Sequence, residues 1–287
     1  MKHGRSPYTS PFYMWNGVAA MFYSSYLTPF HSHNTMQLVL DTQQNFRFRI
    51  KDRNWKTYKS LIIREGVIHQ LDTNDSVQLI IYLDPATQIA RSLKSGRLGE
   101  SEIYSPDLNI YHFVNARELQ QAMLKPEPIL LENLIRRILE CLALGSTIKP
   151  EDERILLTEQ IISTASPEEI TIQSLAQKVC LSESRLRSIF KECTGVPLHR
   201  YILWNKIRFA TNQIMAGHTV NDAAIGAGFA DSSHFHKMMV KMFGVSPSGF
   251  LKDNKSTNFV TCDQSPLHFE TRVYDKSHWI IDRVLIK

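Results

Sequence analysis

Two stretches of this 287-residue chain follow one pattern. Residues 175–190 read LAQKVCLSESRLRSIF, and residues 223–239 read AAIGAGFADSSHFHKMM. Ala176 of the first stretch returns as Ala224, 48 positions later, whereas the pairs that follow the turn lie 49 positions apart. Self-similarity at a nearly fixed period indicates a duplicated structural unit, and the change of period predicts one extra residue in the turn of the second copy.

The matched positions predict the same helical plan in both copies. They pair Cys180 with Gly228, Leu186 with Phe235, Phe190 with Met239, Gly195 with Gly244, and Tyr201 with Phe250. A short helix with a small residue is followed by a tight turn and a second helix whose apolar residues lie four apart. This is the plan of a helix-turn-helix, whose second helix enters the major groove of B-DNA. Two such reading helices would fit successive grooves, which recur every ~34 Å on one face of the duplex.

The distribution of charge favours the same interpretation. Residues 170–252 hold 10 Lys and Arg against 4 Asp and Glu, whereas residues 1–169 hold 18 against 19. A basic domain beside a neutral one is the electrostatic pattern of a nucleic-acid-binding protein. The alternative is a helical bundle with duplicated packing, which needs neither this charge nor a tight turn before each second helix.

The N-terminal part predicts a small barrel or sandwich of short strands over residues ~12–105. β-rich runs that often alternate in polarity occupy residues 36–40, 46–50, 58–63 and 77–83. Near residue 107 the spacing of apolar residues becomes helical, and helices are expected at 116–123, 129–144 and 150–164. The stripe of Leu130, Leu134, Ile138 and Leu142 either forms a homodimer face or covers the barrel within one chain.

The composition excludes several classes of protein. With 43% hydrophobic and 21% charged residues, the chain is neither collagen-like, nor largely disordered, nor a coiled-coil rod. No apolar run reaches the ~18 residues of a membrane span, and the N-terminus lacks the pattern of a signal peptide. The four cysteines fit neither a zinc knuckle nor a disulfide framework, so we expect reduced thiols in a cytoplasmic protein.

Residues ~172–251 resemble the tandem helix-turn-helix domain of the AraC/XylS transcription regulators. The residues that carry the resemblance are Leu175-Ala176, Leu181-Ser182, Leu186, Phe190-Lys191, Thr194-Gly195, Tyr201, Lys206-Ile207, Ala210, Ala224, Gly228-Phe229, Ser233-His234-Phe235, Phe243 to Pro247, and Phe250. Cys180 departs from the family because glycine is usual there, and a side chain in such a turn implies strain. Met239-Val240 and Leu251 also depart, where the family usually has Phe-Lys and arginine.

Residues ~25–85 resemble the cupin-type sensing domain of many such regulators. Phe30 to His33 with Gln37-Leu38 is similar to the first cupin motif, and Arg64 to His69 is similar to the second. The resemblance implies an α+β chain with an N-terminal cupin-like β-barrel, linker helices and an all-α tandem helix-turn-helix domain. The expected boundaries are 1–110 for the sensing domain, 111–169 for the linker and dimer helices, 170–252 for the DNA-binding domain, and 253–287 for a tail without an assigned role.

The candidate DNA-binding residues lie off the apolar stripe of each reading helix. They are Ser184, Arg185, Arg187, Ser188 and Lys191 in the first helix, and Ser232, Ser233, His236, Lys237 and Lys241 in the second. The resemblance places Ser184, Arg187 and Ser188 at base-facing positions. Arg187 is the strongest candidate, because arginine binds guanine O6 and N7 as a bidentate pair. Its alternatives are a phosphate contact and a surface ion pair.

The candidate effector pocket lies at the barrel mouth and consists of His31, His33, Gln37, Trp55, His69 and Tyr82. Three histidines in this pattern can bind a divalent metal ion. A metal-binding cupin, however, has a carboxylate where this chain has the neutral Gln37. We therefore expect no metal and no other cofactor, and histidines that form hydrogen bonds or line a small-molecule pocket.

These observations predict a sequence-specific transcription regulator without catalytic residues. Its expected partners are double-stranded DNA, a small-molecule effector, a second copy of the chain and RNA polymerase, with no membrane. Two alternatives stay open: a metal-dependent cupin enzyme with an appended DNA-binding module, and a regulator whose β-domain only dimerises. Bound iron or manganese would favour the enzyme, and a ligand screen by thermal shift would separate a sensor from a dimerisation module.

Overall fold

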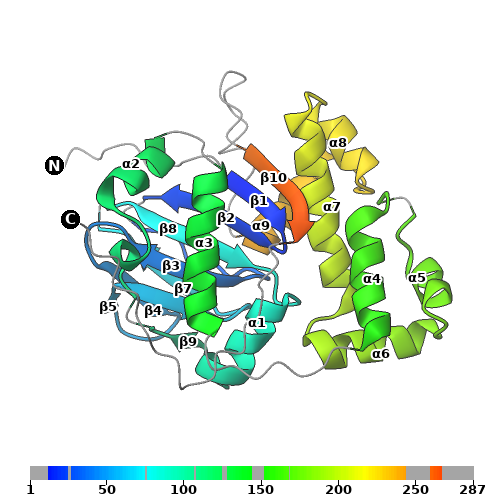
Figure 1. Ribbon diagram of the computed structural model, residues 1–287, viewed down its shortest axis with the longest axis horizontal. Helices are drawn as coiled ribbons and strands as arrows, with labels where there is room; N and C mark the ends of the chain where they lie inside the picture. The colour runs from blue at the N-terminus through cyan, green and yellow to red at the C-terminus, as the bar shows by residue number, and fades with distance from the viewer. Residues whose placement is uncertain are drawn as a thin grey trace, which may run out of the picture.

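The computed structural model describes residues 12–24, 27–74, 76–106, 108–124, 128–143, 152–167, 169–243 and, for the backbone, 259–266. Within these residues a β domain built largely from the N-terminal half lies beside a helical domain, as Figure 1 shows. No helix in the described ranges has the length and apolar character that a membrane span requires. Cys141, Cys180 and Cys193 carry free thiols.

The β domain consists of two sheets. The larger has the strand order β10-β1-β2-β8-β3-β6-β9, and the smaller has the order β5-β4-β7. The strands are β1 Phe12–Asn16, β2 Val18–Tyr23, β3 Met36–Asp41, β4 Phe46–Ile50, β5 Lys56–Tyr58, β6 Ser60–Ile63, β7 His69–Asp72, β8 Gln78–Leu83, β9 Ile103–Tyr104 and β10 Phe259–Pro266. The strands predicted from alternation therefore form, except that the run 58–63 divides at Lys59 between the two sheets.

Strand β8 lies between two packed layers of the domain and is buried on both faces. Ile80 and Tyr82 point into the barrel, where they join a core with Phe48 of the smaller sheet. The alternate residues Leu79 and Ile81 point outward into a second core with the helices. A strand with two buried faces is almost continuously apolar, as the sequence of β8 is.

Helices cover the outer face of the larger sheet (Figure 1). They are α1 Gln88–Leu93, which continues as a π-helical turn over Lys94–Leu98, a 3₁₀ turn at Ile110–His112, α2 Ala116–Leu124 and α3 Pro128–Ala143. Leu134, Ile138 and Leu142 of α3 are at most 1% exposed and pack against the sheet. Of the two alternatives for this stripe, the structure thus shows the cover of the barrel within one chain. The sequence did not predict α1, although Thr87 caps it by accepting from the Ala90 amide at 3.4 Å.

The helical domain follows with α4 Glu153–Thr164, α5 Ile172–Lys178, α6 Glu183–Thr194, α7 Leu198–Met215, α8 Val220–Gly226 and α9 Ser232–Phe243. The duplication extends to the bounds of these helices. Helix α8 begins and ends 48 residues after α5, and α9 begins and ends 49 residues after α6. Both units pack on the long helix α7. The extra residue predicted for the second turn thus lies between α8 and α9.

The two turns have the same pattern of backbone hydrogen bonds. In the first, the amide of Leu181 donates to Ala176 O at 2.9 Å, and in the second the amide of Phe229 donates to Ala224 O at 3.0 Å. This is the Schellman ending of a helix, which places one residue in the left-handed region. That residue is Cys180, with φ of 54°, in the first unit and Gly228, with φ of 76°, in the second. The expectation of strain at Cys180 therefore has a structural basis.

The C-terminal tail contributes strand β10, which pairs in parallel with β1 at the edge of the larger sheet. Sequence analysis assigned no role to this segment. The sequence of the tail also contains strand-like runs at 267–274 and 279–286, which lie outside the described residues.

Replacing Cys180 with glycine should stabilise the helical domain by ~0.5–1 kcal/mol. Relief of the ~1–2 kcal/mol that a side chain costs in the left-handed region exceeds the entropy that glycine adds to the unfolded chain. Urea unfolding of the full chain measures the difference, with Cys180→Ala as the control that keeps the strain. Equal midpoints for the glycine and alanine variants would contradict the expectation.

Candidate DNA-binding face and barrel mouth

Helix α6 is fixed at both ends by local sequence. The Ser182 hydroxyl accepts from the Arg185 amide at 3.3 Å, which caps the N-terminus. Gly195, with φ of 73°, ends the helix, and its amide donates to Lys191 O at 2.8 Å. The buried side of the helix includes Leu186 and Phe190. Packing on that side leaves the opposite face of α6 in solvent.

The five candidate residues of α6 are all exposed: Ser184, Arg185, Arg187, Ser188 and Lys191. Two of them contact neighbours on the same helix. The Arg187 guanidinium donates to Glu183 Oε2 at 3.1 Å, and the Ser188 hydroxyl donates to Glu192 Oε1 at 2.7 Å. Exposed pairs of this kind contribute little stability. Both side chains can therefore exchange these partners for DNA at small cost.

The candidate residues of α9 differ in exposure. Ser233, Lys237 and Lys241 are exposed, whereas Ser232 and His236 are half-buried. Residues off the apolar stripe should be open to solvent, so Ser232 and His236 depart from this expectation. The Nε2 atom of His236 is buried without a hydrogen-bond partner among the described residues. The open part of this helix is its Ser233–Lys237–Lys241 edge.

The basic faces of the two reading helices approach one another near the start of α7. Partial desolvation lowers the pKa of His199, and so do three cations: Arg200 of α7 itself, Arg187 of α6 and Lys241 of α9. His199 is itself exposed. Positive charge from both copies of the repeat therefore gathers at one place on the surface, as phosphate binding requires.

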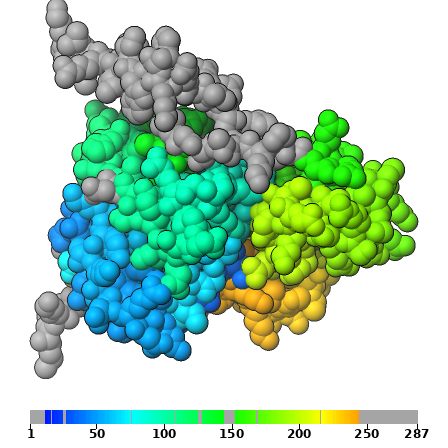
Figure 2. All heavy atoms as spheres, turned by 90° about the horizontal axis from the view of Figure 1, so that it is seen from below, coloured from blue at the N-terminus to red at the C-terminus, as the bar shows by residue number. Residues whose placement is uncertain are grey.

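The C-terminal end of α9 is attached to the barrel. The last carbonyls of a helix have no partner within the helix. Here the amide of Asn34 donates to Lys241 O at 3.0 Å, and the hydroxyl of Thr35 donates to Met242 O at 3.0 Å. Figure 2 shows the orange atoms of α9 next to the blue atoms of the barrel. The segment 33–35, which we call the capping loop, thus caps the second reading helix.

Phe243 extends this attachment into the core. It is 1% exposed, and its ring meets Phe12 edge-on at 5.2 Å, Tyr82 at 5.4 Å and Trp204 at 5.2 Å between ring centres. Phe12 and Tyr82 belong to the barrel, and Trp204 belongs to α7. The barrel interior and the second helix-turn-helix unit thus share one hydrophobic core.

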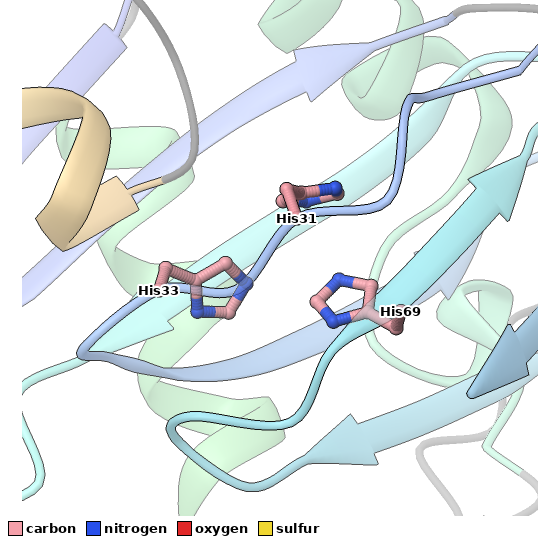
Figure 3. Close-up of side chains that lie close together, drawn as sticks. All are labelled: His31, His33 and His69. Carbon is pink, nitrogen blue, oxygen red and sulfur yellow. The ribbon is translucent and has the colours of Figure 1, made fainter. Parts of the chain in front are cut away.

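Next to the capping loop, three histidines lie together at the barrel mouth. Their imidazoles point toward one another in Figure 3, with ring centres 4.4 Å apart for His31 and His69, 5.2 Å for His33 and His69, and 5.9 Å for His31 and His33. His31 and His69 also pair through their backbones, with N···O distances of 3.1 and 2.9 Å. His33 and His69 are buried, and His31 is half-buried.

A backbone carbonyl two residues away lies 2.9 Å from the Nδ1 atom of each histidine: Pro29 O for His31, Thr35 O for His33 and Val67 O for His69. A carbonyl can only accept, so Nδ1 carries the proton in His31 and His69. The Nε2 atom of these two neutral rings is then left with a free lone pair, whereas Nε2 of His33 lies 2.8 Å from Gln37 Oε1. Burial lowers the pKa of His33 to about 4 and that of His69 to about 3, which keeps both rings neutral at pH 7.

Two other candidate pocket residues lie beside the histidines. The Gln37 side-chain oxygen Oε1 is 2.8 Å from His33 Nε2, and the Tyr82 ring centre is 5.8 Å from that of His33. Trp55 lies apart from this cluster. Its ring stacks with the guanidinium of Arg49 at 4.8 Å, on the outer side of β4, where polar residues alternate with the buried ones. The structure therefore brings together five of the six predicted pocket residues.

A polar cavity of about 740 Å³ lies at the opposite end of β3 from the histidines. Its lining includes Asp41, Arg47, Lys59, Asn74 and Tyr111. Sequence reasoning missed this cavity, because its residues come from separate turns.

Sequence reasoning also missed Asn34, Thr35 and Phe243. The repeat contained one signal for Phe243. The equivalent position in the first copy is the polar Thr194, so a large apolar residue at position 243 indicates a contact that the first copy lacks.

The histidines should make the stability of the chain depend on pH. Above the ordinary imidazole pKa of ~6.5 both the folded and unfolded chains are neutral at these positions. Below pH 6.5 these histidines become protonated in the unfolded chain. In the folded chain, His33 stays neutral down to about pH 4 and His69 down to about pH 3. The free energy of unfolding therefore falls as the pH drops from about 6.5 toward these values. Removing one such group with His69→Gln should flatten the slope by up to ~1.4 kcal/mol per pH unit.

Urea unfolding between pH 7 and pH 5 measures this slope. The matched control is His112→Gln, the same substitution at an exposed histidine outside the cluster. The same slope in both variants would show that His69 does not titrate as described.

Comparison with known proteins supports the interpretation of the helical domain. A family model described as a helix-turn-helix domain matches residues 175–253. The chain is 20% identical over 238 residues to a probable transcriptional regulator, LumQ, of Photobacterium leiognathi, which covers 77% of this chain and 91% of that protein. It is 32% identical over 126 residues to the arabinose operon regulatory protein of Escherichia coli, and this match covers 42% of each chain.

Among solved structures, ToxT from Vibrio cholerae is similar, with a TM-score of 0.45 and 14% identity over 87% of this chain and 98% of that one. The helix-turn-helix match lies on the duplicated units described above. By name, one of the similar proteins is a probable transcriptional regulator and another is an operon regulatory protein. Residues 175–253 are therefore a helix-turn-helix domain, and the chain is similar to regulatory proteins, in agreement with its resemblance to the AraC/XylS regulators.

Proposed function

We propose that this chain regulates transcription by binding a specific DNA sequence, and that its barrel receives an effector at the histidine mouth. The observation that carries the proposal is the duplicated helix-turn-helix, since each copy has an exposed polar edge on its second helix and charge from both copies gathers at His199. One chain thereby carries two reading helices, the number needed for two successive major grooves.

The two reading helices have different roles in this proposal. Helix α6 supplies most of the specificity, because Arg187 can donate two hydrogen bonds to one guanine. Helix α9 mainly positions the duplex, because the open part of its edge holds Lys237 and Lys241, which suit phosphates. Ser184, Ser188, Ser232 and Ser233 complete the interface as hydroxyl donors to bases or phosphates. A second copy of the chain and RNA polymerase belong to the proposal as further partners.

The effector acts through the capping loop. His33 belongs to this loop, and Asn34 and Thr35 donate to the end of α9. A ligand that favours one position of the loop therefore changes the free energy of holding α9 in place. Such a difference in binding free energy between two arrangements is what any effector needs in order to regulate.

The proposal assigns the barrel a regulatory rather than an enzymatic role. His33 and His69 are only 2% and 1% exposed, and the end of α9 lies over the same mouth. A substrate that enters and leaves at every turnover would have to displace the reading helix each time. An effector that binds rarely and moves the helix uses the same closed mouth as a switch.

The test begins with selection of a preferred site from a random DNA pool by the full chain. Arg187→Ala should weaken binding to that site by ~10–100-fold, because one bidentate base contact is lost, and should change binding to random DNA by no more than a few fold. Arg117→Ala, at an exposed arginine of α2 in the β domain, is the matched control and should change neither. Equal losses on both DNAs would make Arg187 a backbone contact.

Salt provides an independent measurement on the same complexes. Affinity of the full chain for DNA should fall steeply between 50 and 200 mM salt, by ~10³-fold or more if about six phosphates are neutralised. A flat response would count against phosphate binding by the His199 region.

A further inference from the structure

We propose that the hairpin of strands β4 and β5, residues 46–58, binds phosphates of the DNA backbone beside the groove that helix α9 enters. We call this segment the basic hairpin. The inference rests on the DNA binding proposed above and adds to it a third contact surface, which the β domain supplies.

The basic hairpin concentrates positive charge in a part of the chain that is otherwise acidic. It contains one acid, Asp52, and five cations within ten residues: Arg47, Arg49, Lys51, Arg53 and Lys56. Residues 1–169 hold 18 Lys and Arg against 19 Asp and Glu in all, so the remainder carries a net negative charge. Four of the five cations are exposed, and Arg49 is half-buried. A local basic surface of this kind fits a polyanion.

The strand β4 holds two of these cations in a fixed direction. Its alternate residues Phe46, Phe48 and Ile50 are buried in the barrel core. Because successive side chains of a strand point to opposite faces, Arg47 and Arg49 project together from the outer face of the smaller sheet. The antiparallel pairing of β4 with β7 fixes this register. The cations therefore stand on a rigid strand rather than on a loose loop.

The side chain of Arg49 is arranged to receive an anion. Its Nε atom donates to Gln70 Oε1 at 2.7 Å, and its guanidinium lies over the rings of Phe30 and Trp55, at 4.9 and 4.8 Å from their centres. Among the described residues, nothing accepts from its two terminal nitrogens. A guanidinium that is oriented by stacking and keeps both terminal nitrogens free can bind a phosphate with two parallel hydrogen bonds.

Neighbouring acids neutralise only part of this charge. Arg47 pairs with Asp72, and Arg53 pairs with Glu102. Within the described part of the chain, the other three cations form no ion pair with a carboxylate. The guanidinium of Arg47 also lies over the Trp55 ring, at 5.4 Å, so two like charges share one ring. An anion placed between them relieves their repulsion.

The basic hairpin is connected to the second reading helix by a short path. Three backbone hydrogen bonds join the last turn of α9 to Lys51, by way of the capping loop and residues 66–68. They run from Asn34 N to Lys241 O at 3.0 Å, from Gly66 N to His33 O at 2.9 Å, and from Lys51 N to Ile68 O at 2.8 Å.

This path limits the distance between the two surfaces. It spans at most ~28 Å, which is less than the ~34 Å of one turn of the duplex. Figure 2 shows the azure atoms of the strands near residue 50 and the orange atoms of α9 along the same lower edge of the molecule. A duplex that receives α9 therefore carries phosphates within reach of the basic hairpin.

A second copy of the chain suits this surface less well than DNA does. A two-fold symmetric contact sets a surface against itself, which would bring the same cations together. An acidic surface of another protein is the remaining occupant, since Phe30 and Ile68 beside the hairpin are 42% and 44% exposed. The neighbouring reading helix favours DNA, and the test separates the two.

The first measurement compares two duplexes, with the full chain as the protein. One duplex ends at the edges of the selected site, and the other continues by ~10 base pairs, one helical turn, on each side. The longer duplex should bind more tightly, because only its flanks offer phosphates to the basic hairpin.

The second measurement removes two cations. The double variant Arg49→Ala with Lys51→Ala should weaken binding to the longer duplex by ~10-fold, and should reduce the slope of log affinity against log salt by ~2. The loss should not depend on the flanking sequence, because phosphates carry no sequence information. Lys51→Glu, a single change at an exposed residue, should act in the same direction without disturbing the stacked side chains.

The matched control removes the same charge elsewhere in the β domain. Arg117→Ala with Arg137→Ala, at exposed positions of α2 and α3, should leave affinity and salt slope unchanged. Equal affinity of the unsubstituted chain for the two duplexes, or a hairpin variant that behaves like this control, overturns the inference and leaves the surface to an acidic protein. Failure of the unsubstituted chain to bind either duplex overturns the proposed function, and this inference with it.

Discussion

The end of helix α9 is the point on which the arrangement of this molecule depends. Its last carbonyls need donors that the helix lacks, and the barrel supplies them from Asn34 and Thr35. Phe243 adds a buried ring that touches barrel strands on one side and α7 on the other. Leaving two carbonyls and a phenylalanine without partners would be costly, so the barrel and the second reading helix stay together.

The duplication makes the attachment asymmetric. Position 194 in the first unit is a threonine whose hydroxyl donates to Phe190 O at 2.6 Å, so α6 ends within its own unit. The equivalent position in the second unit is Phe243, whose ring packs against the barrel residues Phe12 and Tyr82. The end of one reading helix is therefore bonded within its own unit, and the end of the other is bonded to the barrel mouth. A change at the mouth acts directly on the end of α9 and not on the end of α6.

Local patterns predicted much of the fold, and long-range contacts were beyond them. The repeat predicted both helix-turn-helix units and the extra residue in the second turn, because helical spacing and turn geometry are local. The contact of Thr35 with Met242 joins residues 207 positions apart, for which no periodicity exists. Burial of the α3 stripe looks the same in sequence whether a sheet or a second chain covers it. Trp55 was assigned to the pocket only because its side chain is aromatic. The alternation of polar and apolar residues in β4 already placed Arg47 and Arg49, which it contacts, on the outer side of the strand.

The direct measurement of the attachment is amide hydrogen exchange at Asn34, whose N–H donates to Lys241 O. Although this residue lies in a loop, its amide should exchange as slowly as amides inside the sheet. The protection should disappear in Phe243→Ala while that of β8 stays. Exchange at the rate of an open loop in the unsubstituted chain, or unchanged protection in the variant, would contradict the account.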